Sequence, residues 1–267
     1  MNEVILKAEN IFYQSADMKS YSAPLPAKIL NNVSFNVNRG SVLGITGESG
    51  SGKTTLAKII AGIFLPTSGS INFYFQKDWI HSKSKPVQIL FQNDGELINP
   101  FRKVNDILKD VFEIKYNKNS DYSKEILEHF DLFELNPDLL SRKGFQLSGG
   151  EQQRIALARI VAVEPEILVL DEPFSSQDIE AQLNIIKLIQ RIKDKLNLTV
   201  IIVTHDLKII NKLCDTLIIL KDGEIIESGF AKSIISDPQN SHTKFLLKAQ
   251  SIQLTKSEIH SFQKKDE

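Results

Sequence analysis

The hydrophobic pattern near the N-terminus predicts strands, then a glycine loop, then a helix. Val33, Phe35 and Val37 alternate with polar residues, which is the pattern of a half-buried strand. A short apolar run over 42–47 ends in glycine and leads into 53–64, where apolar residues recur at helical spacing. We therefore expect a buried strand, a glycine-rich loop and a helix in succession.

The rest of the chain mostly alternates helical and strand patterns. Residues 67–92 are expected to form a small hairpin region that closes on the apolar stretch 87–91. Four segments have the pattern of helices: 106–116, 123–135, 149–163 and 178–196. Two short apolar runs are predicted to be strands, 167–170 and 199–204. The second is followed by a helix and then by a hairpin over 217–229, which turns at Asp222-Gly223. This order predicts an α/β fold with a mostly parallel sheet covered on both faces, and an antiparallel flank from the N-terminal strands.

Composition limits the classes of protein to consider. The 267 residues suffice for one or two domains. Lysine plus arginine total 32 against 33 acids, so nucleic acid is not an expected partner. The single cysteine, Cys214, rules out an intrachain disulfide and fits a reducing compartment. We find no secretion signal and no apolar run long enough to span a membrane, so membrane function would require other chains.

The strongest chemical signal is a phosphate-loop pattern between the strand over 42–47 and the helix that follows. Its residues are Gly47, Glu48, Ser49, Gly50, Ser51, Gly52, Lys53 and Thr54, with Thr55 assigned to the same nucleotide site. Glycines let backbone N–H groups point at phosphate oxygens, Lys53 would reach the β- and γ-phosphates, and Thr54 would bind Mg²⁺. A plain glycine-rich turn is the alternative, but the strand and helix on either side favour a phosphate loop.

A second signal is the buried run 167–170 followed directly by Asp171 and Glu172. Ligands of open α/β sheets bind at the carboxyl ends of the strands. Asp171 would hold Mg²⁺ through its hydration shell, and Glu172 would orient or deprotonate the attacking water. A solvated strand end is the alternative for these residues alone, and the phosphate loop makes the catalytic interpretation the better one.

The third signal is the segment 147–154, Leu-Ser-Gly-Gly-Glu-Gln-Gln-Arg, which resembles the signature motif of ABC ATPases. Ser148 is a good helix cap, and Gly149 and Gly150 would let a phosphate approach the backbone closely. Gln152 is assigned to the nucleotide site with them. Taken alone, the segment could be a simple capped helix start, but it lies between the two other motifs in the order found in that family.

The resemblance to ABC ATPases implies further roles along the chain. Gln92 resembles the glutamine loop, which senses Mg²⁺ and nucleotide, and is expected to bind the metal and assist catalysis; a polar residue at a strand end is the alternative. His205 resembles the switch histidine that contacts the γ-phosphate, rather than a structural histidine. Asp178 occupies the position of the dimer-contact aspartate. Tyr13 or Tyr21 could stack on adenine, although each could equally be ordinary packing.

The implied mechanism joins two such domains head to tail, with ATP and Mg²⁺ between the phosphate loop of one and the signature motif of the other.

Two more segments resemble the ATPases of peptide and nickel importers. They are 98–104, Ile-Asn-Pro-Phe-Arg-Lys-Val, and 237–247, which contains His242. No second ligand near His242 is evident in the sequence, so we assign no metal site there, and no cysteine cluster implies an iron–sulfur centre. The resemblance implies a peripheral subunit on the cytoplasmic face of the membrane. Its expected partners are transmembrane permease subunits, a second ABC ATPase subunit in a homodimer or heterodimer and, indirectly, an extracellular solute-binding protein.

The expected organisation is a single ABC ATPase domain over 1–249, with a helical subdomain over about 93–163, followed by a polar tail over 250–267 that is frayed or disordered. Two other functions are open at this point. One is an ABC ATPase that acts on ribosomes or DNA without a transporter, although the chain carries one motif set and no heptad run. The other is a regulatory subunit that binds nucleotide without hydrolysing it, although Gln92, Glu172 and His205 are all present.

Overall fold

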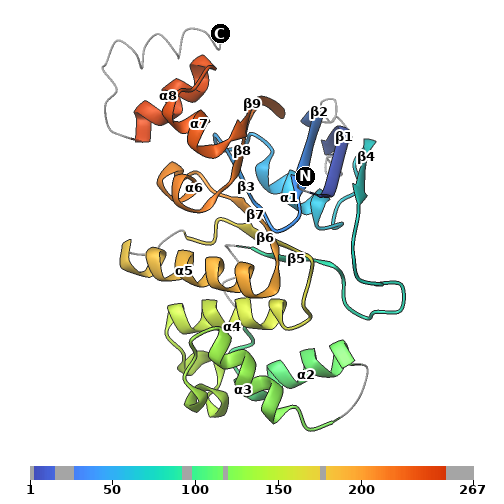
Figure 1. Cartoon of the computed structure of the whole chain (residues 1–267), viewed down its shortest axis with the longest axis vertical. Coiled ribbons are helices and arrows are strands. Elements are labelled where there is room, and N and C mark those ends of the chain that lie inside the picture. The colour runs from blue at the N-terminus through green and yellow to red at the C-terminus, as the bar shows by residue number, and fades with distance from the viewer. Residues whose placement is uncertain (1–2, 16–26, 92–97, 117–119, 175–178, 251–267) are drawn as a thin grey trace, which may run out of the picture.

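The central element of the protein is a mixed sheet of mostly parallel strands. The computed structural model describes residues 3–15, 27–91, 98–116, 120–174 and 179–250. In these residues a six-stranded sheet has the order β5 (Val87–Leu90), β6 (Ile167–Asp171), β7 (Thr199–Val203), β3 (Val42–Gly47), β8 (Thr216–Lys221) and β9 (Glu224–Phe230) (Figure 1). Neighbouring strands are parallel except β9, which runs antiparallel to β8. The carboxyl ends of the parallel strands therefore meet at one edge.

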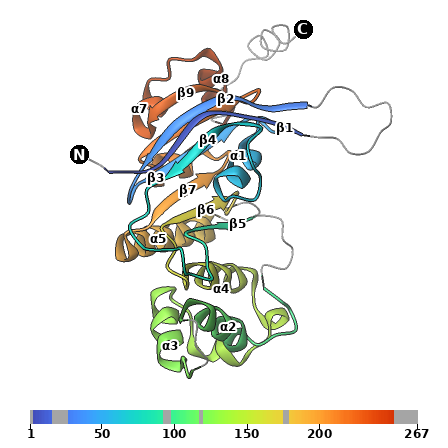
Figure 2. The ribbon, with the colours of Figure 1, turned by 90° about the vertical axis from the view of Figure 1, so that its right-hand side faces the viewer.

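A smaller antiparallel sheet lies beside the central one. Its strands are β2 (Ala27–Asn38), β1 (Val4–Ser15) and β4 (Ser68–Phe73), in that order. The helix α1 (Lys53–Ile60) packs with β1, β2 and one face of the central sheet in a common hydrophobic core (Figure 2). The start of α1 is thereby fixed relative to both sheets.

Alternating side chains on the central strands divide the core into two layers. On β6, Ile167 and Val169 pack with the core that contains α1, whereas Leu168 and Leu170 pack with the core of the opposite face. Successive side chains of a strand point to opposite faces, so a strand covered on both sides must be apolar throughout. This explains the uninterrupted apolar run that precedes Asp171.

The remaining helices occupy the far face and the two ends of the molecule. They are α2 (Val104–Tyr116), α3 (Ser123–Leu132), α4 (Gly149–Val161), α5 (Ile179–Leu196), α6 (Leu207–Leu213), α7 (Ala231–Ser236) and α8 (Ser241–Gln250), with short 3₁₀ turns over Pro137–Ser141 and Gly144–Gln146. In Figure 1 α2, α3 and α4 lie at one end and α7 and α8 at the other. Among the described residues we find no helix with the length and apolarity required to cross a membrane.

The fold class and most of the expected elements are confirmed. The 217–229 hairpin turns through Asp222 and Gly223, whose φ angles are 49° and 77°. The predicted hairpin over 67–92 is wrong, because β4 pairs antiparallel with β1 while β5 pairs parallel with β6 in the other sheet. Apolar runs identify strands but not their partners, which lie elsewhere in the chain. The helix predicted over 53–64 ends at Ile60, and the polar tail from 251 lies outside the described residues.

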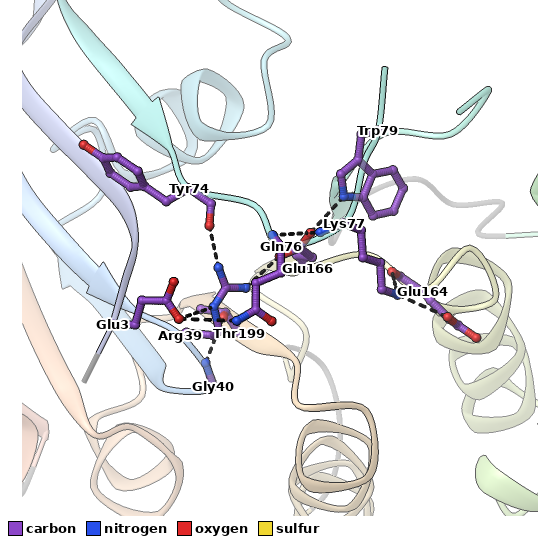
Figure 3. Close-up of polar contacts among 10 residues, drawn as sticks. All are labelled: Glu3, Arg39, Gly40, Tyr74, Gln76, Lys77, Trp79, Glu164, Glu166 and Thr199. Carbon is purple, nitrogen blue, oxygen red and sulfur yellow. Dashed lines mark hydrogen bonds and ion pairs between the residues drawn. The ribbon is translucent and has the colours of Figure 1, made fainter. Parts of the chain in front are cut away.

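The connection between β4 and β5 is held by one buried carboxylate, that of Glu166, just before β6 (Figure 3). Glu166 is 7% exposed and forms an ion pair with Arg39 at 2.7 Å. It also accepts hydrogen bonds from the backbone N–H groups of Gln76 and Lys77 and from the indole N–H of Trp79. Burial favours the neutral acid, but these hydrogen bonds outweigh it and lower the pKa of Glu166.

We expect Glu166→Ala to lower the free energy of unfolding by about 3–5 kcal/mol, because it leaves a buried guanidinium and several N–H groups without their acceptor. Since the folded pKa is depressed, the contribution of Glu166 is present above the ordinary carboxyl pKa and is lost as pH falls through the folded value. Urea unfolding measured at neutral and acidic pH tests this. Glu164→Gln, which alters an exposed pair of contacts with Lys77 and Lys115, should change stability by at most about 1 kcal/mol. Equal effects of the two variants would contradict the role of Glu166.

Candidate functional site

The loop between β3 and α1 has a backbone that requires glycine at specific positions. At Gly47 φ is 149°, and a Cβ there would lie 2.0 Å from the carbonyl oxygen of Leu220. At Gly52 φ is 98°, and a Cβ would lie 2.9 Å from the carbonyl oxygen of Ile29. L-residues rarely adopt such angles, and the carbonyl oxygens of Leu220 and Ile29 are backbone atoms that cannot move aside cheaply. The loop therefore holds its curled shape through packing against β8 and β2.

Lys53 lies at the start of α1 and turns back over this loop. Its ammonium group donates hydrogen bonds to the carbonyl oxygens of Gly47 at 2.9 Å and Glu48 at 2.6 Å. Burial lowers the pKa of Lys53, while the negative charges of Glu172, Asp171 and Glu48 oppose that shift. A partly buried cation thus sits within the loop, beside the two carboxylates that follow β6.

Asp171 and Thr54 face each other across the site. Asp171 is 5% exposed, and burial raises its pKa, while a hydrogen bond with the Thr54 hydroxyl and the charge of Lys53 act in the opposite direction. Within the described part of the chain, Asp171 Oδ1 and Ser51 Oγ are buried atoms without a hydrogen-bond partner. Buried polar atoms normally have partners, and Asp171 lines the cavity, so its Oδ1 is suited to a polar ligand.

Glu172 is aimed into the site by an unusual backbone conformation and by two side chains. Its φ of 52° is uncommon for a residue with a side chain, and its N–H bonds to the Val203 carbonyl oxygen at 2.8 Å. His205 Nδ1 lies 2.9 Å from Glu172 Oε1, and the Thr204 hydroxyl donates to Oε2 at 3.4 Å. A carboxylate oxygen accepts a hydrogen bond from this nitrogen when the imidazole carries its proton at Nδ1. Asp206, which caps α6, follows His205 directly.

These groups line a common cavity of about 540 Å³ at the carboxyl ends of the strands. The predicted residues among its walls are Gly47, Ser49, Gly50, Gly52, Lys53, Thr54, Thr55, Asp171, Glu172 and His205. The structure therefore brings the phosphate-loop pattern, the two carboxylates and the histidine together. Glu48 and Ser51 belong to the loop but do not line the cavity, since Ser51 is buried and the Glu48 side chain contacts His242.

The signature segment lies apart from the cavity lining. Ser148, Gly149 and Gly150 are exposed at the start of α4, where the Ser148 hydroxyl accepts a hydrogen bond from the N–H of Glu151 at 3.3 Å. The Glu151 carboxylate bonds back to the N–H of Ser148, which confirms the predicted helix cap. Gln152 directs its side-chain amide to the carbonyl oxygen of Gly144 at 3.1 Å, within its own chain.

Sequence reasoning missed some residues of the cavity. Ile29 and Val203 line it, and both are ordinary strand residues whose patterns carry no chemical signal. Thr204, directly after β7, holds Glu172 and carries no such signal either. Tyr13 stacks on Phe64, with ring centroids 5.4 Å apart, and does not line the cavity. Of the other predicted residues, Gln92, Asp178 and Tyr21 lie outside the described residues.

Comparison with known proteins identifies the family of this chain. The family model described as ABC transporter matches residues 30–175, which include the phosphate loop, the signature segment and both carboxylates. The chain belongs to the ABC transporter family. It is an ATPase whose hydrolysis is coupled to transport, and nucleotide is its ligand.

Individual relatives agree with this membership. The chain is 35% identical over 231 residues to the oligopeptide transport ATP-binding protein OppF of Streptococcus mutans, covering 83% of this chain and 75% of that protein. It is 32% identical over 237 residues to the dipeptide transport ATP-binding protein DppF of Haemophilus influenzae, covering 86% and 72%. Among solved structures, the ATP-binding cassette MJ0796 in a dimeric post-hydrolysis state with ADP and Pi has a TM-score of 0.70 at 27% identity, covering 85% of this chain and 99% of that one.

Proposed function

We propose that this chain is the ATP-hydrolysing subunit of a peptide importer. The observation that supports this most strongly is the common cavity of Lys53, Asp171, Glu172 and His205. The peptide cargo is inferred from relatives named for dipeptide and oligopeptide transport and from the segments 98–104 and 237–247. Nickel is the less favoured cargo, since the relatives above are named for peptides.

The cavity supplies the groups that hydrolysis of a phosphoanhydride requires. Lys53 would exchange its loop carbonyl contacts for the β- and γ-phosphates, and the loop N–H groups would bind phosphate oxygens. Glu172 would accept a proton from the attacking water or orient it, while His205 keeps that carboxylate in position and contacts the γ-phosphate. The close contact of Glu172 with His205 argues against a regulatory subunit that only binds nucleotide.

The residues present fit a magnesium ion bound together with the nucleotide. Asp171 Oδ1 is a buried oxygen without a hydrogen-bond partner, and the Thr54 hydroxyl lies beside the same carboxylate. Mg²⁺ prefers oxygen ligands and usually takes only one or two from the protein, the rest being phosphate and water. We therefore assign Thr54 and Asp171 to the metal, with Gln92 as a further proposed ligand. When bound, the ion neutralises charge that develops on the phosphates.

The exposed signature segment supports a head-to-tail dimer. Because Ser148, Gly149 and Gly150 lie outside this chain's own cavity lining, we infer that they act on nucleotide held by a second ATPase subunit. The structural neighbour MJ0796 is described as dimeric, which supports pairing of two ATPase subunits. Gln152, whose side chain bonds to its own chain, would shape the signature segment.

We assign residues 1–249 to one ABC ATPase domain with a helical subdomain over about 93–163.

The proposed partners are two transmembrane permease subunits, a second ABC ATPase and, indirectly, a solute-binding protein on the other side of the membrane. This chain would dock from the cytoplasmic face. Purification of the tagged chain from gently solubilised native membranes, with identification of bound proteins, tests the proposal. Recovery of permeases and a peptide-binding protein is expected. Recovery of ribosomes or DNA-repair factors without any membrane protein would overturn the transport proposal while leaving the ATPase intact.

A further inference from the structure

A histidine near the start of α8 is buried against the phosphate loop, although the two are far apart in the sequence. His242 Nε2 lies 3.4 Å from Oε1 of Glu48, the second residue of the loop. The histidine side chain is 8% exposed, whereas that of Glu48 is 48% exposed. A buried imidazole thus lies beside a carboxylate that could otherwise move in solvent.

The position of His242 is fixed by hydrogen bonds that tie the start of α8 to β9. The Glu227 carboxylate on β9 accepts hydrogen bonds from the backbone N–H groups of Gln239 at 2.8 Å and Asn240 at 3.3 Å. Asn240 in turn accepts a hydrogen bond from the backbone N–H of His242 at 2.8 Å. Because β9 pairs with β8, and β8 with β3, the imidazole is held by the same sheet that carries the loop.

Glu48 links this histidine to the phosphate-binding lysine. Its carbonyl oxygen accepts the hydrogen bond from Lys53 Nζ at 2.6 Å and another from the N–H of Ser51 at 3.2 Å. Its carboxylate also acts electrostatically on Lys53. A carboxylate in a phosphate-binding loop is unfavourable in itself, because it repels phosphate and competes for the lysine charge.

We propose that His242 is a positioning residue for the nucleotide site, which holds the Glu48 carboxylate against α8 and away from the phosphates. This inference rests on the proposed phosphate loop. It gives α8 a direct influence on nucleotide affinity, through the contact of His242 with Glu48. The expected consequence is energetic coupling between His242 and Glu48 in nucleotide binding.

A double-mutant cycle on the full chain tests the proposal, with Kd measured for MgADP and for a non-hydrolysable MgATP analogue. His242→Ala should raise Kd about fivefold, because the released carboxylate can turn toward the phosphates. In a Glu48→Gln background, the same His242→Ala change should alter Kd less than about twofold, since no charge remains to be held. His242→Gln, which keeps a polar side chain beside Glu48, should restore most of the wild-type affinity.

Two reference variants separate this inference from the function on which it rests. Lys53→Ala must weaken nucleotide binding if the loop holds phosphates. An unchanged Kd for that variant would count against the proposed site itself. His81→Ala, on an exposed segment, should leave Kd unchanged. The positioning role is overturned if His242→Ala binds nucleotide normally, or if its effect is equally large with Gln at position 48. The latter result would mean that His242 only supports the fold.

Discussion

Replacement of Glu172 by Gln is expected to lower the rate of ATP hydrolysis by about a hundredfold or more while nucleotide still binds. The amide keeps the size of the side chain and can still contact Thr204 and His205, but it cannot accept a proton from water. Positioned general bases contribute about 10²–10⁴ in rate. Phosphate release from the assembled transporter, with the substitution in this chain alone, measures the effect, and retention of labelled ATP measures binding.

The matched control for this variant is Glu128→Gln, which makes the same chemical change at an exposed site on α3 whose contact with Lys124 is loose. It should hydrolyse ATP at the wild-type rate. If Glu172→Gln also turned over ATP normally, the cavity of this chain would not be a hydrolytic one. If it lost nucleotide altogether, Glu172 would have a binding role rather than the proposed role in activating water.

Replacement of Lys53 by Ala is expected to weaken ATP binding by about tenfold to a hundredfold, because hydrogen bonds from a charged group to the phosphates are lost. Lys53→Met should behave similarly, since it keeps the length of the side chain and removes the charge. Kd for MgATP, measured by calorimetry on the full chain, gives the result directly. The melting temperature measured in parallel reports whether either variant alters the fold.

Lys124→Ala removes a lysine that is 86% exposed and serves as the control for the loss of positive charge. Its effect on Kd should be less than about twofold. Similar weakening by Lys124→Ala and Lys53→Ala would indicate only a general attraction between ATP and positive charge. Unchanged affinity in both Lys53 variants would contradict the phosphate contact.

The parts of the site that could be predicted from sequence are those fixed by local spacing. The phosphate loop needs glycine at defined positions of a short segment. Gly52 is one of them, because its backbone lies in the left-handed region that favours glycine. The cap formed by Ser148 and Glu151 is likewise a contact within a few residues. The position of His205 near Glu172 was expected because a parallel sheet brings the carboxyl ends of neighbouring strands together, and β6 does pair with β7.

The parts that could not be predicted depend on contacts between distant segments. The strand pattern over 67–92 carries no information on partners. It therefore predicts a hairpin, although β4 and β5 belong to different sheets. The contact of His242 with Glu48 has the same origin, because neither residue has a local pattern that points to the other. Tyr13 is a residue for which the sequence allows two roles, stacking on adenine or ordinary packing. In the structure its ring packs against Phe64.

The most direct test of the central claim is peptide uptake driven by ATP. The transporter containing this chain would be reconstituted in vesicles with its binding protein, and entry of a labelled oligopeptide would be followed with and without MgATP. We predict uptake with the wild-type chain and almost none when this chain alone carries Glu172→Gln. Equal uptake by the two complexes would contradict the claim that hydrolysis at this site powers import.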